Sequence, residues 1–108
     1  MKNSDNQRLV VASCSTFETA VQLSKILVTE KLAYKSSIHP HLTSFYAWNN
    51  NIQEKHEYFI YIFTSKELLE AIEKRLTEFG FDDDQQLIAL SINEMGTAFK
   101  DWAESIIK

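Results

Sequence analysis

The stretch that decides the fold is Ser44-Phe45-Tyr46-Ala47-Trp48-Asn49-Asn50-Asn51-Ile52. It joins two runs, 33–48 and 52–64, that are rich in the β-branched and aromatic residues typical of strands. Three asparagines lie between the runs, and asparagine tolerates the left-handed backbone of a tight hairpin turn. The second run, of about 13 residues, would extend roughly 43 Å as a strand. We therefore predict a β-hairpin that is too long for one small chain to cover and that also serves assembly.

A strand and a helix are predicted before the hairpin. Segment 8–14 contains an uninterrupted apolar run, which indicates a strand buried on both faces. A capping-box pattern follows, in which Ser15 would cap the next helix and Glu18 would bond back to it. Apolar residues then recur at helical spacing, so we expect this helix to end near Leu32.

A second helix, a last strand and a terminal helix are predicted after the hairpin. Residues 64–67 form another capping box, and Gly80 is well placed to end the helix that follows. Segment 87–92 is apolar and is predicted to be a central strand, while a short helix is expected to begin at 96–97. The order β-α-β-β-α-β plus a final helix is an α+β, ferredoxin-like plan.

The ferredoxin-like plan leaves one face of the sheet without helices. All residues of 58–63 are apolar or aromatic, and successive side chains of a strand point to opposite faces. Both faces of this strand are therefore apolar, and the helices can cover only one of them. An exposed apolar patch of this size usually marks an interface. We therefore expect the sheets of several subunits to pack together. The alternative is that the terminal helix covers this face and the protein is a monomer.

Composition limits the class of protein. The chain has 108 residues and a formal charge of −4, without the concentrated basic face that nucleic-acid binding requires. Cys14 is the only cysteine, which fits a reducing compartment. Residues 1–7 are polar and lack a signal core, and no run is long enough to cross a membrane. We expect one cytoplasmic domain over 1–108, with 1–7 as a flexible tail.

The chain resembles the CutA family of divalent-cation tolerance proteins from Val10 to Ile106. The most specific match is Thr43-Ser44-Phe45-Tyr46-Ala47-Trp48, which is similar to the family's T-S-x-Y-x-W stretch. Further matching positions are Glu30-Lys31-Leu32-Ala33, Glu57, Thr64, Gly96 and Trp102. The resemblance implies a ferredoxin-like subunit in a homotrimer, with hairpins that reach across to neighbouring subunits. It also implies that Tyr46, Trp48, Glu57 and Trp102 line a cleft between subunits.

The departures from the family pattern fall on its site more than on its scaffold. The family's characteristic H-P-Y-x-x-P-E stretch is replaced by residues 80–86. The other changed positions are Asn50 for glycine, Lys35 for cysteine, Phe63 for lysine and Phe99 for tyrosine. We therefore expect poor metal binding on a retained scaffold.

Three features could carry metal or thiol chemistry. His39 and His41 would lie on the same side of a strand and are the candidate ligands for a divalent cation such as copper or zinc; the alternative is an exposed loop kinked at Pro40. Residues 82–84 are three aspartates that could hold a hard cation, although a solvated turn fits them better. Cys14 precedes a helix and could be a thiolate, but a buried apolar role fits the end of a strand better.

The residues predict a binding protein and no enzyme. Gly80 and Gly96 are the only glycines, so a Gly-rich phosphate loop is absent, and no nucleophile-and-base or paired-acid pattern is found. The first hypothesis is a non-enzymatic, CutA-like homotrimer associated with the response to metal ions. The alternative is a trimeric regulator of small ligands or proteins, similar to the PII signalling proteins. A metal-dependent enzyme is the third reading.

Overall fold

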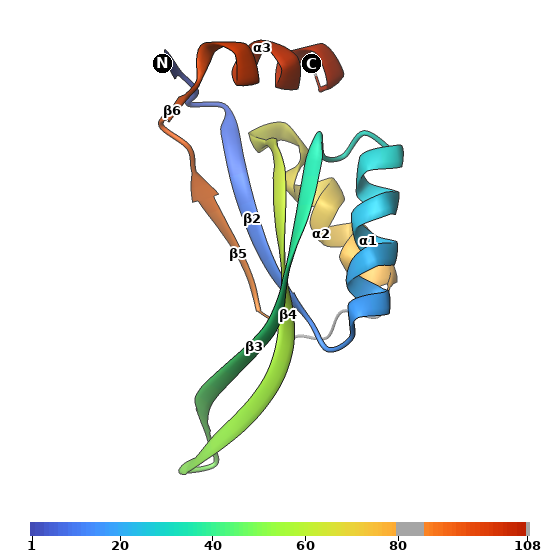
Figure 1. Cartoon of the computed structure of the whole chain (residues 1–108), viewed down its shortest axis with the longest axis vertical. Coiled ribbons are helices and arrows are strands. Elements are labelled where there is room, and N and C mark those ends of the chain that lie inside the picture. The colour runs from blue at the N-terminus through green and yellow to red at the C-terminus, as the bar shows by residue number, and fades with distance from the viewer. Residues whose placement is uncertain (80–85, 108) are drawn as a thin grey trace.

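A computed structural model describes residues 1–79 and 86–107 of the chain (Figure 1). In chain order the elements are β1 (Lys2–Asn3), β2 (Gln7–Cys14), α1 (Phe17–Thr29), β3 (Lys35–Trp48), β4 (Asn51–Ser65), the short 3₁₀ helix η1 (Lys66–Leu68), α2 (Leu69–Glu78), β5 (Leu87–Ser91), β6 (Glu94–Met95) and α3 (Thr97–Ile106). Within these residues no helix is both long and apolar enough to cross a membrane.

The main sheet has the strand order β3-β4-β2-β5, with every neighbouring pair antiparallel. Helices α1 and α2 lie together on one face of it (Figure 1). This arrangement confirms the predicted α+β, ferredoxin-like fold. The prediction of a central last strand is wrong, because β5 is an edge strand that pairs only with β2 within the described residues. Its apolar run misled the prediction: Ile88 and Leu90 are each 47% exposed.

The long hairpin is confirmed and extends beyond the end of the sheet (Figure 1). Trp48 pairs with Asn51, so Asn49 and Asn50 form a two-residue turn. Both have positive φ, 50° and 64° respectively. This pair of left-handed residues matches the turn type whose twist suits a β-hairpin, and asparagine is among the few side chains that tolerate it.

The core lies between the helices and one face of the sheet. Ile60 and Ile62 of β4 are fully buried there against Leu23 and Leu27 of α1 and further residues of α2. Alternation along β4 therefore turns Phe59, Tyr61 and Phe63 to the opposite face. By register the same face carries Leu9 and Val11 of β2 and Ile88 and Leu90 of β5. We call this apolar surface, formed by Leu9, Phe59, Tyr61, Ile88 and Leu90 around the already buried Val11, the open face.

Helix α3 lies across one end of the sheet and does not cover the whole open face (Figure 1). Its Ala103 packs in a second cluster with Tyr34, Met95 and Ile107, against which Phe63 also packs. Ile88 and Leu90 keep about half of their surface accessible. The terminal helix therefore does not supply the cover that a monomer would need.

Residues 1–7, for which a flexible tail was predicted, include a short strand. Strand β1 pairs with β6 near the other end of the chain. Ser4 is 2% exposed, and its hydroxyl donates a 2.8 Å hydrogen bond to the carbonyl oxygen of Ile92. Polar composition predicted a tail because the partner strand is distant in sequence.

Both predicted capping boxes are wrong in detail. Thr16, not Ser15, caps α1, and its hydroxyl oxygen accepts a hydrogen bond from the backbone N–H of Thr19. Helix α1 ends at Thr29, three residues before the predicted end at Leu32. Thr64, the first residue of the second box, bonds to another segment instead, as described below. Gly80 and the aspartates 82–84 lie outside the described residues.

Candidate functional site

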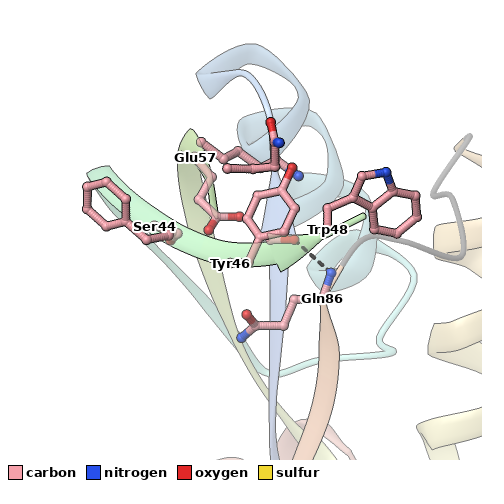
Figure 2. Close-up of a pocket in the computed structure, with 9 residues that line it drawn as sticks. Ser44, Tyr46, Trp48, Glu57 and Gln86 are labelled. Atoms are coloured by element: carbon pink, nitrogen blue, oxygen red, sulfur yellow. Dashed lines mark hydrogen bonds between the residues drawn. The ribbon is translucent and has the colours of Figure 1, made fainter. Parts of the chain in front are cut away.

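A cavity of about 850 Å³ lies where the hairpin leaves the sheet. Figure 2 shows Ser44, Tyr46, Trp48, Glu57 and Gln86 around it. We call it the hairpin pocket; its lining residues are Ser13, Ser44, Phe45, Tyr46, Trp48, Gln53, Lys55, Glu57 and Gln86. They come from β2, β3, β4 and the residue before β5, so the pocket exists only in the folded chain.

Strand alternation explains which side chains face the hairpin pocket. Gln53, Lys55 and Glu57 occupy alternate positions on β4 and therefore point to one face. Across the hairpin, Ser44 pairs with Lys55 and Tyr46 pairs with Gln53. Residues directly opposite in an antiparallel pair lie on the same face. The turn at Asn49 and Asn50 thus fixes the register that brings these polar groups together.

Glu57 is the most unusual residue of the pocket. The residue is only 6% exposed, yet within 1–79 and 86–107 its side chain forms no hydrogen bond or ion pair. Lys55, which is half-buried, likewise has no acidic partner among these residues. The pocket therefore offers one anionic and one cationic side chain, neither of which has a charged partner among the described residues.

The base of the pocket is held by a link between β2 and the start of β5. The backbone N–H of Gln86 donates a 2.9 Å hydrogen bond to the hydroxyl oxygen of Ser13 (Figure 2). The backbone N–H of Ser13 donates to the carbonyl oxygen of Gln86 at 3.0 Å. Ser13 is 1% exposed. This reciprocal pair fixes the position of Gln86 beside the cavity.

Aromatic side chains form the outer part of the pocket. Phe45, Tyr46 and Trp48 are 66%, 46% and 57% exposed. Large apolar groups are seldom so exposed together on an isolated protein. The pocket therefore combines a buried polar base with an open aromatic rim.

The structure brings together three of the four predicted cleft residues. Tyr46, Trp48 and Glu57 line the hairpin pocket. Trp102 belongs to α3, where its ring lies 5.8 Å from that of Tyr34 and 5.8 Å from that of Phe99. Helix α3 and the hairpin turn lie at opposite ends of the molecule (Figure 1). Trp102 of the same chain therefore does not line this pocket.

Sequence reasoning missed Ser13, Ser44, Gln53, Lys55 and Gln86. Alternation from Glu57 would have found Lys55 and Gln53 on the same strand face. The sequence around Ser13 and Gln86 shows no comparable pattern, because these two residues come together only when β2 pairs with β5.

The prediction that His39 and His41 share one side of a strand is wrong. A β-bulge interrupts the register between His39 and Leu42, and His41 has a φ of 57°. His39 Nδ1 lies 2.9 Å from the hydroxyl of Tyr61, whereas the His41 ring lies 5.9 Å from that of Tyr58. Tyr58 and Tyr61 point to opposite faces of β4. The extra residue of a bulge reverses alternation, so these imidazoles do not converge on one ion within a subunit.

No other described side chains form a metal centre: among residues 1–79 and 86–107, no group of three His, Cys, Asp or Glu residues gathers. The charged patch at 54–57 divides between the two faces of β4. His56 Nε2 lies 3.4 Å from Glu54 Oε2 on one face, while Lys55 and Glu57 face the pocket.

Cys14 belongs to the core and carries no thiolate. Cys14 is 1% exposed and belongs to the core cluster that contains Val10 and Ala12. Burial raises the pKa of this thiol to about 11. A neutral, buried thiol packs as a small apolar group, as the position at the end of a strand indicated.

Comparison with known proteins gives one consistent result. The family model described as CutA1 divalent ion tolerance protein matches residues 8–105. The divalent-cation tolerance protein CutA of Thermus thermophilus is 27% identical over 96 residues, which cover 89% of this chain and 93% of that protein.

Solved structures agree with this match. The structure of CutA from Synechococcus elongatus is similar with a TM-score of 0.91 and 26% identity, covering 99% of this chain and 95% of that chain. A second structure of that protein, complexed with a Bis-Tris molecule, gives a TM-score of 0.89 at 26% identity, with 98% of each chain covered. Since the family match spans nearly the whole chain, this protein belongs to the CutA family of divalent ion tolerance proteins.

Proposed function

We propose that this CutA-family protein acts as a non-enzymatic homotrimer in the response to divalent cations, with the hairpin pocket as its ligand site. The observation that carries the proposal is the open face, where Ile88 and Leu90 are 47% exposed. An apolar surface of this kind is stabilised when identical subunits cover it. Three open faces meeting around one axis would remove these side chains from water.

The far end of the hairpin supports the same assembly. Ile52 is 80% exposed and Phe45 is 66% exposed, at the part of the hairpin that extends beyond the sheet. A neighbouring subunit placed against this end would cover them. In such an assembly Trp102 of one subunit could close the hairpin pocket of another, as the family resemblance implies.

One related structure was determined with a small molecule bound. The Synechococcus elongatus CutA is a complex with Bis-Tris, a small hydroxylated amine. We propose that this chain also accepts a small polar molecule, in the hairpin pocket. Binding of a small molecule is also what a PII-like regulatory role requires, because a regulator of that class would bind a small ligand at the boundary between subunits. We therefore give this role as the second candidate function.

Direct metal binding is the weaker part of the proposal. His39 and His41 remain candidate ligands for copper or zinc only through copies from different subunits, since a closed site requires about four ligands. We place the protein in the cytoplasm, because its single cysteine is an unpaired thiol.

Three measurements test these proposals. Light scattering measures the mass of the assembly, and a mass equal to that of one chain would contradict the trimer. Calorimetric titration with Cu²⁺ and Zn²⁺ compares the wild type with the double variant His39→Ala/His41→Ala, and equal affinities would exclude these ligands. A thermal-shift panel of nucleotides and metabolites tests the regulatory role, which predicts that at least one compound raises Tm.

A further inference from the structure

Lys55 and Glu57 place opposite charges on one wall of the hairpin pocket. They are two residues apart on β4, so their Cα atoms are separated by roughly 7 Å. No ion pair joins them, and each lacks a charged partner within the described residues. The pocket therefore presents a separate cationic group and a separate anionic group, both directed at the same cavity.

We propose that the hairpin pocket binds a small zwitterion of the α-amino acid class, a proposal that rests on the ligand-binding role given above. The ammonium group of the ligand pairs with the carboxylate of Glu57, and its carboxylate pairs with the ammonium of Lys55. Charge-assisted hydrogen bonds of this kind are stronger than neutral ones, above all where water is excluded. Glu57 is 6% exposed, so this residue is largely sheltered by the pocket wall.

The remaining lining groups fit the rest of such a ligand. The amides of Gln53 and Gln86 offer both donors and acceptors beside the charged pair. Tyr46 and Trp48 provide aromatic surface for a side chain of the ligand. A cavity of about 850 Å³ accommodates any of the standard amino acids, and a polar base with an aromatic rim is usual for small-molecule sites.

Other classes of ligand fit less well. A bare Ca²⁺ or Zn²⁺ ion needs several carboxylate, thiolate or imidazole ligands, and among the described lining residues Glu57 is the single carboxylate. A polyphosphate needs clustered cations, whereas Lys55 is the single cation among the described lining residues and Glu57 would repel phosphate. A purely apolar ligand would leave both charges unpaired.

The test is a thermal-shift screen of the full-length protein with the twenty standard L-amino acids, followed by calorimetry on the compound that raises Tm most. Two analogues of that compound are titrated beside it: the amine that lacks the carboxylate, and the acid that lacks the amino group. We expect each analogue to bind at least about tenfold more weakly, because each leaves one charged group of the pocket unpaired.

Variants identify the residues responsible. Glu57→Gln and Lys55→Met are each expected to weaken binding by about tenfold or more. Glu54→Gln is the matched control, because Glu54 lies on the same strand but on its other face; it should leave the affinity unchanged. If Glu57→Gln also disrupts assembly, Lys55→Met and the two analogues still decide the matter.

The outcomes separate this inference from the proposed function. A protein of trimeric mass that no amino acid stabilises overturns the zwitterion and leaves the trimer standing. Binding that Glu57→Gln weakens but Lys55→Met does not would instead show a site for organic cations and would also overturn the inference. A protein of monomeric mass contradicts the proposed assembly whatever it binds.

Discussion

The hydroxyl of Thr64 donates a 2.7 Å hydrogen bond to the carbonyl oxygen of Leu32. This bond joins the end of β4 to the segment that follows α1, and Thr64 is fully buried. A second hydrogen bond lies beside it: the backbone N–H of Tyr34 donates to the carbonyl oxygen of Phe63 at 3.0 Å. These two hydrogen bonds therefore hold the segment just before β3 against the end of β4, so that the two open ends of the hairpin stay together.

Replacing Thr64 with valine should destabilise the protein. Valine has nearly the shape of threonine but cannot donate, so a buried carbonyl loses this hydrogen bond, at a cost of about 1–2 kcal/mol. Urea unfolding measures the change in the free energy of unfolding. Thr77→Val is the control, because the hydroxyl of Thr77 bonds to Glu73 on an exposed helix surface; equal effects of the two variants would contradict the role of Thr64.

The hairpin turn should respond to substitution according to backbone handedness. Asn50 has a φ of 64°, where alanine is strained by roughly 1–2 kcal/mol and glycine is not. We expect Asn50→Ala to lower Tm and Asn50→Gly to keep or raise it. A differential scanning experiment on both variants checks this order, and an Asn50→Ala protein more stable than Asn50→Gly would argue against the left-handed turn.

Cys14 should be unreactive while the protein is folded. Burial raises the pKa of its thiol from the ordinary value of 9.0 to about 11. Between these values the folded chain holds more protons than the unfolded chain, so stability is full below pH 9 and falls as the pH rises toward 11. Iodoacetamide labelling at pH 8 should be slow in buffer and fast in denaturant. Rapid labelling of the native protein would contradict burial of the thiol.

The pair Glu30–Arg75 should contribute to the acid limb of stability. Arg75 donates two hydrogen bonds to the Glu30 carboxylate, at 3.0 and 2.8 Å, and these hold the pKa of Glu30 below its ordinary value. The stability that this pair contributes is therefore fully present when the pH is above the ordinary pKa of Glu30 in the unfolded chain. It is lost as the pH falls through the lowered pKa of Glu30 in the folded chain. In Arg75→Met, an NMR titration should show a higher pKa for Glu30 than in the wild type. Lys74→Met, which removes a neighbouring charge, is the control and should change it little.

The fold was largely predictable because its decisive signals are local. Asn49 and Asn50 mark the turn, and alternation on either side marks the two strands, so the hairpin required no knowledge of distant contacts. Tyr46, Trp48 and Glu57 were grouped through the resemblance to the CutA family, and the register of the hairpin explains why Tyr46 and Glu57 lie on one face.

The missed features depend on long-range pairing or on irregular backbone. Ser13 and Gln86 meet because β2 and β5 pair, and no spacing in the sequence states that. Lys2 and Asn3 form a strand because β6 supplies partners from the other end of the chain. His39 and His41 separate because a bulge changes the alternation between them, and alternation alone cannot foresee an inserted residue.

Charge placed on the open face should prevent assembly. Leu90→Lys would bury an ammonium group between subunits, so we expect its mass to fall to that of one chain, 12.5 kDa. Val28→Lys is the control, because Val28 is 40% exposed on α1, on the other side of the sheet. This control should keep the wild-type mass.

The central claim is that the open face is covered by identical subunits, and light scattering of the wild-type protein after size exclusion tests it most directly. The expected mass is three times the 12.5 kDa of one chain and is stable on dilution. A single species of 12.5 kDa, folded and with the open face in water, would contradict it.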